Sequence, residues 1–310
     1  MKNVEDIMKV LMKELHRVVI GQDEVIEQVL VTLLCDGNGL LEGYPGLAKT
    51  LAIKSLASAL DLKFSRIQST PDLMPSDITG TYFIEEGSGG KRSFKFNPGP
   101  IFANIVLADE INRATPKTQS ALLEAMQEKQ VTVGNSTFKL DLPFFVLATQ
   151  NPIEQEGTYP LPEAQADRFL LKILVGYPSP QEELAIVNQY TAAGTNVRLK
   201  KVLNKEKIQY LQDLVKQMPI ANDLKNRIIR IVTLTRKHEL IAYGASPRAS
   251  IALTLASKAY ALIKGKNYVS SADIEKMAYP VLRHRIIPTF EAERKGLSPD
   301  DVVSAVLKKA

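Results

Sequence analysis

Short apolar runs alternate with amphipathic stretches over the first 175 residues of the chain. The runs contain few polar positions, which is typical of strands buried on both faces of a parallel sheet. The predicted strands are Leu40–Glu42, Phe64–Ile67, Ile105–Ala108, Phe144–Thr149 and Phe169–Val175. The predicted helices are Val4–Arg17, Asp23–Cys35, Lys49–Leu60 and Pro116–Glu128. This alternation predicts an α/β fold of three layers, with helices on both faces of the sheet.

Two segments interrupt the alternation with the pattern of β-hairpins. In Tyr82–Phe96 the glycine-rich turn Glu85–Lys91 is flanked by aromatic residues. In Val131–Phe138 the pair Gly134-Asn135 separates two β-prone triplets. Both patterns predict a tight turn between two antiparallel strands. Either they are ordinary connections, or they are inserted hairpins that contact something outside the main site.

The strand signals stop at Gly176-Tyr177-Pro178-Ser179-Pro180, and two prolines in five residues are a strong break. Beyond this break the pattern is helical. The predicted helices are Gln181–Thr191, Lys205–Gln217, Asn222–His238, Pro247–Lys264 and Ala272–Arg283. We therefore expect an α/β core over residues 1–176 and a small all-helical domain over residues 177–310.

Composition agrees with a globular protein of two domains, because the 310 residues are 45% hydrophobic and 24% charged. No run approaches 18 apolar residues and the N-terminus is charged, so we expect neither a membrane span nor a secretory signal. Cys35 is the only cysteine, so an intramolecular disulfide is impossible. These features predict a cytoplasmic protein.

The net charge of +5 is unevenly distributed. Residues 1–175 carry 17 Lys/Arg and 22 Asp/Glu, whereas residues 176–310 carry 22 and 12. The second part is thus basic, which indicates either a solvated surface or a surface that meets an acidic one on a neighbouring copy or another partner. Its lysines are scattered and have no aromatic residues interleaved, so we do not expect a nucleic-acid partner.

The segment Gly43–Thr50 (Gly-Tyr-Pro-Gly-Leu-Ala-Lys-Thr) has the pattern of a phosphate-binding loop between a strand and a helix. Such a loop directs backbone N–H groups at phosphates, the lysine reaches the β/γ oxygens, and the threonine hydroxyl binds Mg²⁺. Ala48 stands where the pattern has glycine. We expect Ala48 to adopt right-handed backbone angles at the helix start, where glycine is not required.

Two carboxylates follow the predicted strand Ile105–Ala108, as a hydrolytic site requires. Asp109 would hold Mg²⁺ together with Thr50, and Glu110 would activate the attacking water. Asn151 follows the next predicted strand, where its amide would orient the water or sense the γ-phosphate, unless it only forms an Asn-Pro turn.

Two arginines could neutralise charge on a transferred phosphoryl group. Arg168 lies just before the last predicted strand, and Arg248 opens a predicted helix of the second domain. A lone arginine is usually part of a surface salt bridge. The assignment of Arg168 and Arg248 to a catalytic site therefore depends on their order and spacing relative to the other motifs of the chain. His284 lies in Arg283-His284-Arg285, which we interpret as an interface or a solvated helix end, and no histidines share a metal-ligand spacing.

Together these segments resemble the MoxR-type ATPases of the AAA+ superfamily, and the resemblance covers nearly the whole chain. It extends to Val19–Gln22, Arg66–Gly80, Ala108–Ala114, Ala148–Pro152, Glu163–Phe169, Gly244–Ala249 and Leu282–Arg285. The family commonly has alanine before the lysine of the phosphate loop, so Ala48 favours membership. The resemblance implies an AAA+ P-loop core with two inserted hairpins, followed by a helical lid.

The resemblance also implies roles for matching positions. ATP would be bound by Gly21, Gln22, Gly43, Pro45, Gly46, Leu47, Ala48, Lys49, Thr50 and Leu51. The catalytic set would be Glu110, Asn151 as sensor 1, Arg168 as the arginine finger and Arg248 as sensor 2, with Thr50 and Asp109 on Mg²⁺. Arg113 is a rival finger, and Arg248 could serve its own nucleotide or a neighbour's.

A finger that acts on a neighbour implies a ring, for which we expect a hexamer. The family further implies chaperone-like remodelling or maturation of client proteins, often with a partner that carries a von Willebrand factor A domain. Two alternatives stay open, a DNA or RNA motor of the helicase-like AAA+ group and a nucleotide-switched binding module with little turnover. Glu110 argues against the second.

Overall fold

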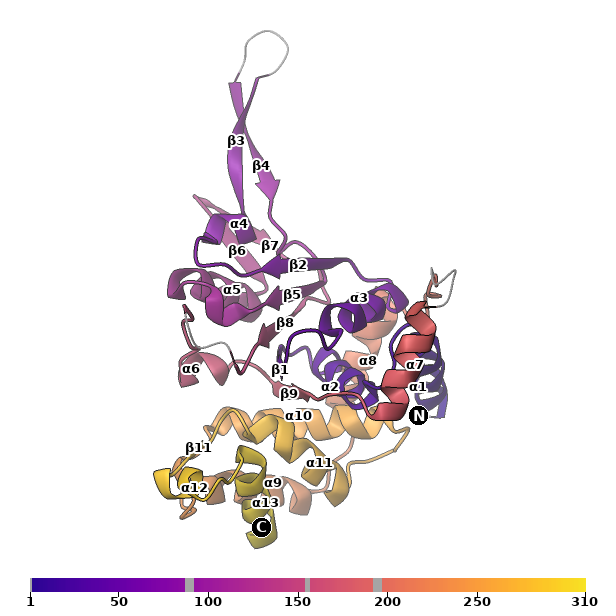
Figure 1. Ribbon diagram of the computed structural model, residues 1–310, viewed down its shortest axis with the longest axis vertical. Coiled ribbons are helices and arrows are strands. Elements are labelled where there is room, and N and C mark those ends of the chain that lie inside the picture. The colour runs from indigo at the N-terminus through magenta and orange to yellow at the C-terminus, as the bar shows by residue number, and fades with distance from the viewer. Residues whose placement is uncertain (1, 87–91, 154–156, 192–196) are drawn as a thin grey trace.

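A computed structural model of the protein describes residues 2–86, 92–153, 157–191 and 197–310. Its N-terminal part is built on a five-stranded sheet in the order β2-β5-β8-β1-β9, in which all pairs are parallel (Figure 1). The strands are β1 Gly39–Gly43, β2 Phe64–Gln68, β5 Ile105–Asp109, β8 Phe145–Gln150 and β9 Leu171–Val175. Each corresponds to one predicted strand, so the predicted parallel sheet is confirmed.

Successive residues of the strands belong to two different hydrophobic clusters. In β5, for example, Ile105 and Leu107 join one cluster, while Val106 and Ala108 join the other. The first cluster includes α1 Lys2–Leu15, α2 Asp23–Leu34 and α3 Lys49–Ala59. The second includes α5 Pro116–Glu128, next to the short α4 Pro75–Thr79. Since strand side chains alternate between faces, helices cover both faces of the sheet, as predicted.

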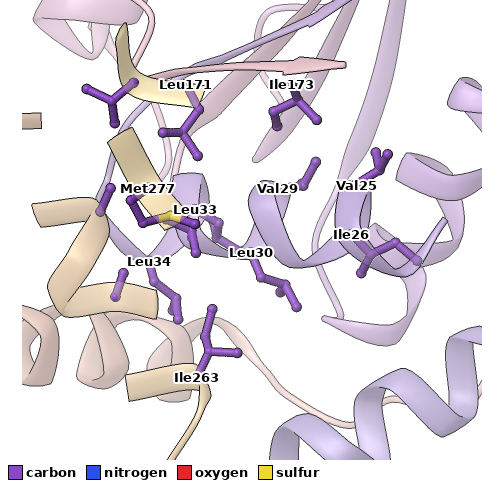
Figure 2. Packing of buried hydrophobic residues seen from close by; sticks show 14 of the residues in the cluster. Val25, Ile26, Val29, Leu30, Leu33, Leu34, Leu171, Ile173, Ile263 and Met277 are labelled. Carbon is purple, nitrogen blue, oxygen red and sulfur yellow. The ribbon is translucent and has the colours of Figure 1, made fainter. Parts of the chain in front are cut away.

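Helix α2 lies between the sheet and the C-terminal helices. Figure 2 shows its apolar side chains with Leu171 and Ile173 of β9 on one side and Ile263 of the C-terminal part on the other, and Met277 of the C-terminal part beside Leu33. Leu30 and its neighbours are at most a few per cent exposed, and each buried side chain of this size contributes about 1.5–3 kcal/mol. The C-terminal helices therefore share one continuous core with the sheet.

Both predicted hairpins are present. Strands β3 Gly80–Glu86 and β4 Arg92–Pro98 pair over their whole length and extend far from the sheet (Figure 1). Of the predicted turn Glu85–Lys91, the first two residues belong to β3 and residues 87–91 lie outside the described residues. Strands β6 Gln130–Val133 and β7 Ser136–Lys139 form the second hairpin. The two are joined at their bases, because the rings of Phe96 and Phe138 stack with centroids 4.2 Å apart.

The C-terminal part is a helical bundle, which confirms the five predicted helices. Its helices are α7 Pro180–Thr191, α8 Lys205–Gln217, α9 Asn222–Thr235, α10 Pro247–Ile263, α11 Ser271–Leu282, α12 Phe290–Arg294 and α13 Pro299–Lys309. It also has an antiparallel pair that we did not predict, β10 Ile241–Tyr243 with β11 Ile287–Pro288. Strands of two or three residues are too short to show an alternating pattern.

Two short helices complete the core, a 3-10 helix at Ile111–Arg113 and α6 Glu163–Ala166. None of the helices in the described ranges is both long and apolar enough to cross a membrane. The domain boundary between residues 176 and 177 stays a prediction.

Candidate functional site

The phosphate loop joins β1 to α3, and its backbone is shaped by residues with positive φ. Gly46 has φ +83°, and no atom lies within 4 Å of the place where a Cβ would be. Ala48 has φ 54° and ψ 22°, so our expectation of right-handed angles was wrong. A left-handed alanine costs about 1–2 kcal/mol, and such strain is held where a functional loop requires it. Here it turns the chain into the first turn of α3.

Lys49 begins α3 with its ammonium group turned back towards the loop. Its Nζ donates a hydrogen bond to the carbonyl oxygen of Gly43 at 2.5 Å. Burial lowers the pKa of Lys49, and the nearby carboxylates of Asp109 and Glu110 oppose that shift. The lysine therefore lies between the loop and the two acids. The unpaired N–H groups of the first turn of α3, where Thr50 and Leu51 lie, add a second source of positive potential.

Asp109 ends β5, and its two carboxylate oxygens are bound from the two neighbouring strands. The hydroxyl of Thr149, on β8, donates to Oδ1 at 2.5 Å. Arg66, on β2, donates to Oδ2 from Nε at 3.0 Å and from Nη2 at 2.6 Å. The carboxyl ends of parallel strands meet at one edge of the sheet, and here they hold Asp109 in one orientation.

Glu110 follows directly in a left-handed conformation, with φ 55° and ψ 49°. Its backbone N–H donates to Thr149 Oγ1 at 2.8 Å, so one threonine hydroxyl links the two acids. Its carboxylate accepts a hydrogen bond from Gln68 Nε2 at 2.7 Å and lies 3.3 Å from Arg113 Nε. Arg113, the rival finger, is thus ion-paired to the acid of its own chain.

We did not predict a role for Thr149, Gln68 or Arg66. Gln68 ends β2, Arg66 lies in the middle of that strand, and Thr149 lies near the end of β8; both strands are neighbours of β5. Asn151 follows β8 and is buried, and its Oδ1 accepts a hydrogen bond from Ile153 N at 3.2 Å. Its position two residues after Thr149 agrees with the sensor assignment, which stays a prediction.

A cavity of about 340 Å³ lies beside the phosphate loop. It is lined by Ile20, Gly21, Gln22, Pro45, Gly46, Leu47, Ala48, Gly176, Tyr177, Pro178, Glu183 and Ile186. Half of these residues were predicted to bind the nucleotide. Tyr177 and Ile186 were missed, because we interpreted Gly176–Pro180 only as a domain break and Gln181–Thr191 only as a helix. The ring of Tyr177 stacks on that of Tyr44 with centroids 5.3 Å apart.

Gln22 connects this cavity to the phosphate loop. Its Nε2 donates to the carbonyl oxygen of Leu47 at 2.5 Å. Its Oε1 is buried and has no hydrogen-bond partner among the described residues. A mostly apolar cavity of this size with one unsatisfied acceptor suits a purine base, which carries N–H donors on its edge.

The donor set at the sheet edge suits Mg²⁺. The Thr50 hydroxyl and the Asp109 carboxylate are hard oxygen ligands, which Mg²⁺ prefers, and this ion is usually completed by water and substrate phosphates. Within the described part of the chain, no group of three His, Cys, Asp or Glu residues could hold a metal. The residues present therefore fit an ion that is bound together with a nucleotide.

Arg168 and Arg248 lie at a second site, separate from the cavity beside the phosphate loop. They share a groove of about 360 Å³, formed mainly by the loop between α2 and β1, the end of α5, the segment before β9 and helix α10. Arg168 is exposed and donates to Gln127 Oε1 at 2.6 Å, and Arg248, 57% exposed, lies 3.9 Å from Asp167. Neither lines the cavity beside the phosphate loop. The structure brings these two arginines together, apart from that cavity.

Comparisons with known proteins agree with this geometry. Residues 38–171 match the model for the "ATPase family associated with various cellular activities (AAA)", and residues 233–306 match the AAA lid domain. Chaperone MoxR1 of Mycobacterium tuberculosis is 46% identical over 95% of this chain and 79% of its own length. Protein YeaC of Bacillus subtilis is 45% identical over 95% of this chain and 91% of its own.

A solved structure supports the same conclusion. A crystal structure of a Cytophaga hutchinsonii protein, 43% identical, superposes with a TM-score of 0.92 over 99% of this chain and 95% of that one. Protein MoxR of Paracoccus denitrificans is 30% identical over 92% of this chain and 90% of its own length. The chain therefore belongs to the MoxR-type ATPases of the AAA+ superfamily.

Proposed function

We propose that the chain hydrolyses ATP with Mg²⁺ as one subunit of a homo-oligomeric ring, a hexamer, and uses the reaction to remodel or mature client proteins. The observation that carries the proposal is the separation of two half-sites. One half is the phosphate loop with Asp109 and Glu110, and the other is the groove that holds Arg168 and Arg248. In a ring, the second half of one subunit meets the first half of the next.

In the first half-site, the base occupies the cavity beside Gln22, and the N–H groups of the loop and of α3 bind the phosphates. Thr50 and Asp109 would hold Mg²⁺, which would neutralise negative charge on the phosphates. Glu110 accepts a proton from water as the water oxygen attacks the γ-phosphorus and the bond to the bridging oxygen breaks. Asn151 orients that water.

The second half-site supplies positive charge to the neighbour. Charge spreads over the γ-phosphate oxygens in the transition state, and an arginine there accelerates hydrolysis by about 10³–10⁵. Arg168 is the finger in this proposal because it is exposed, whereas Arg113 is paired with Glu110 of its own chain. Arg248 lies in the same groove as Arg168, so we assign it to the same neighbouring nucleotide.

Mixed rings test the proposal. Lys49→Ala and Arg168→Ala should each be inactive alone, the first because it cannot hold phosphate and the second because it gives its neighbour no finger. In an equal mixture, about a quarter of the interfaces combine an intact loop with an intact finger. We therefore expect phosphate release at roughly that fraction of the wild-type rate. A mixture as inactive as its components would contradict a finger that acts in trans.

The client class is proposed on the resemblance and on one relative's name, Chaperone MoxR1. We propose a cytoplasmic client or partner with a von Willebrand factor A domain. A Glu110→Gln ring with ATP should retain it in a pull-down, and the same ring with ADP should release it. If Glu110→Gln hydrolyses ATP at the wild-type rate, Glu110 is not the base.

The basic C-terminal part keeps a nucleic-acid motor as the second candidate. Such a motor requires that DNA or RNA stimulate ATP hydrolysis, with stimulation that falls steeply as salt rises. We expect equal rates of phosphate release with and without single-stranded DNA or RNA at low salt. Stimulation severalfold would favour the motor.

A further inference from the structure

The segment Arg283–Arg285, at the end of α11, binds the core segment that carries Arg168. Arg285 comes from a position more than 100 residues away in sequence, and its side chain is only 3% exposed. Its Nε donates to Asp167 Oδ1 at 2.8 Å. Its Nη2 donates to the carbonyl oxygens of Asp167 at 3.2 Å and Phe169 at 2.5 Å. These are the residues immediately before and after Arg168.

The remaining nitrogen of Arg285 extends the same contact. Nη1 donates to Leu170 O at 3.0 Å, just before β9, and to Val281 O of α11 at 2.5 Å. One guanidinium thus connects three backbone carbonyls of the core segment with the helix from which it comes. A planar group with five N–H donors can make this set of bonds, whereas a lysine ammonium has three donors from a single nitrogen.

His284 adds a bond to the same place. Its Nε2 lies 3.0 Å from Phe169 O. Burial, reinforced by the positive charge of Arg285, holds the pKa of His284 well below its usual value, so the ring is neutral and Nε2–H donates. We expected an interface or a solvated helix end for this segment. The histidine instead lies half-buried between the lid and the core.

Asp167 links this contact to Arg248. Its Oδ2 accepts a hydrogen bond from Ser246 Oγ at 2.9 Å, and the same Oγ, which caps α10, accepts from Arg248 N at 3.2 Å. The guanidinium of Arg248 lies 3.9 Å from Asp167. One carboxylate is therefore held by Arg285 from α11 and by the N-terminus of α10. The backbone segments that carry Arg168 and Arg248 are thus held together through Asp167 and Arg285, and the side chain of Arg285 is buried at their centre.

We propose that Arg285 is a positioning residue for hydrolysis at the neighbouring subunit's site. It fixes the Arg168 segment to the lid helices α10 and α11, so that finger and lid move as one body. This rests on the proposed function, because it takes Arg168 to act in trans. Movement of the lid would then be coupled to the position of the finger that reaches the next nucleotide.

The test uses Arg285→Lys, which keeps the charge opposite Asp167 but loses the fork that binds the backbone. Arg283→Gln is the matched control. It removes the other arginine of the same segment, whose guanidinium binds Asp300 and the carbonyl oxygen of Lys172, not the finger segment. Each variant is assayed for ring assembly by light scattering, for binding of a fluorescent ATP analogue, and for kcat and KM of phosphate release.

For Arg285→Lys we expect assembly and nucleotide binding within twofold of wild type, KM unchanged, and kcat lowered at least tenfold. For Arg283→Gln we expect kcat within twofold of wild type. Mixing Arg285→Lys with Lys49→Ala should raise activity above either alone, because Lys49→Ala subunits give the intact loops a correctly held finger. A residue that only supports its own chain's nucleotide site would show no such rescue.

Wild-type kcat in Arg285→Lys, or a loss that Lys49→Ala does not rescue, would overturn the proposal. If Arg285→Lys does not assemble, Asp167→Asn, which keeps the shape of the aspartate side chain, takes its place. Asp167→Asn must then lower kcat and regain activity when it is mixed with Lys49→Ala. If it does not, the proposal is overturned equally. The pair Arg168→Ala and Lys49→Ala separates the two claims. If that pair recovers activity and the Arg285→Lys pair does not, only the positioning role fails.

Discussion

Replacing Thr149 with valine removes a single hydroxyl that connects both acids of the site. Valine has nearly the same shape, and Thr149 is 1% exposed, so the packing of β8 is kept. The hydroxyl donates to Asp109 Oδ1 at 2.5 Å and accepts from Glu110 N at 2.8 Å. The change therefore releases one carboxylate oxygen and leaves one backbone N–H without its acceptor.

The expected fall in kcat for Thr149→Val follows from the loss of these two hydrogen bonds. A hydrogen bond to a charged group contributes about 1.5–3 kcal/mol and a neutral one about 0.5–1.5 kcal/mol. If about 2 kcal/mol of this orients Asp109 and Glu110 in the transition state, kcat falls about 30-fold. The loop and the cavity beside Gln22 make no use of the hydroxyl, so binding of a fluorescent ATP analogue without Mg²⁺ should stay within threefold of wild type.

Steady-state phosphate release measures the effect, and Thr149→Ser is the matched control. Serine keeps the hydroxyl and loses one methyl group, so its kcat should stay within a few-fold of wild type. If Thr149→Val hydrolyses ATP as fast as wild type, the hydroxyl does not orient the acids. If Thr149→Ser is as slow as Thr149→Val, the loss comes from packing and not from the hydrogen bonds.

Two other substitutions test the binding half-site. Ala48→Gly should keep ATP binding and raise the melting temperature slightly, because glycine adopts φ 54° without the cost of about 1–2 kcal/mol for an L-residue. Ala48→Val should weaken binding of a fluorescent ATP analogue, and equal binding by both variants would refute a role for the left-handed backbone. Tyr177→Ala should weaken that binding about fivefold, since one aromatic contact contributes about 1 kcal/mol. The exposed Tyr268 provides the control, and equal affinities for Tyr177→Ala and Tyr268→Ala would exclude a nucleotide contact of Tyr177.

Residues whose position in the fold follows from local sequence could be predicted. Lys49 is placed by the strand, turn and helix that surround it, and Asp109 and Glu110 follow from an apolar strand that ends in acids. Thr149 and Gln68 could not be recognised in this way. Their contacts depend on the order β2-β5-β8, in which neighbours in the sheet are far apart in the chain. No local pattern records that order.

The prediction of the backbone conformation of Ala48 was wrong for a different physical reason. Propensity predicts right-handed angles for alanine, and the tertiary structure of the loop overrides that preference at a cost of about 1–2 kcal/mol. The contacts of Arg285 were hidden because most of them are to backbone carbonyls, which carry no sequence signal, and the ion pair with Asp167 joins positions more than 100 residues apart. Part of the charge asymmetry is met within the chain, because Arg248 and Arg285 of the basic part pair with Asp167 of the acidic part.

A direct view of an assembled Glu110→Gln ring with ATP and Mg²⁺, by electron cryomicroscopy, tests the central claim that each site is completed by the next subunit. We predict the guanidinium of a neighbour's Arg168 within hydrogen-bond distance of the γ-phosphate, with Arg248 of the same neighbour beside it. A γ-phosphate contacted instead by Arg113 of its own chain, with Arg168 still bound to Gln127, would contradict the account.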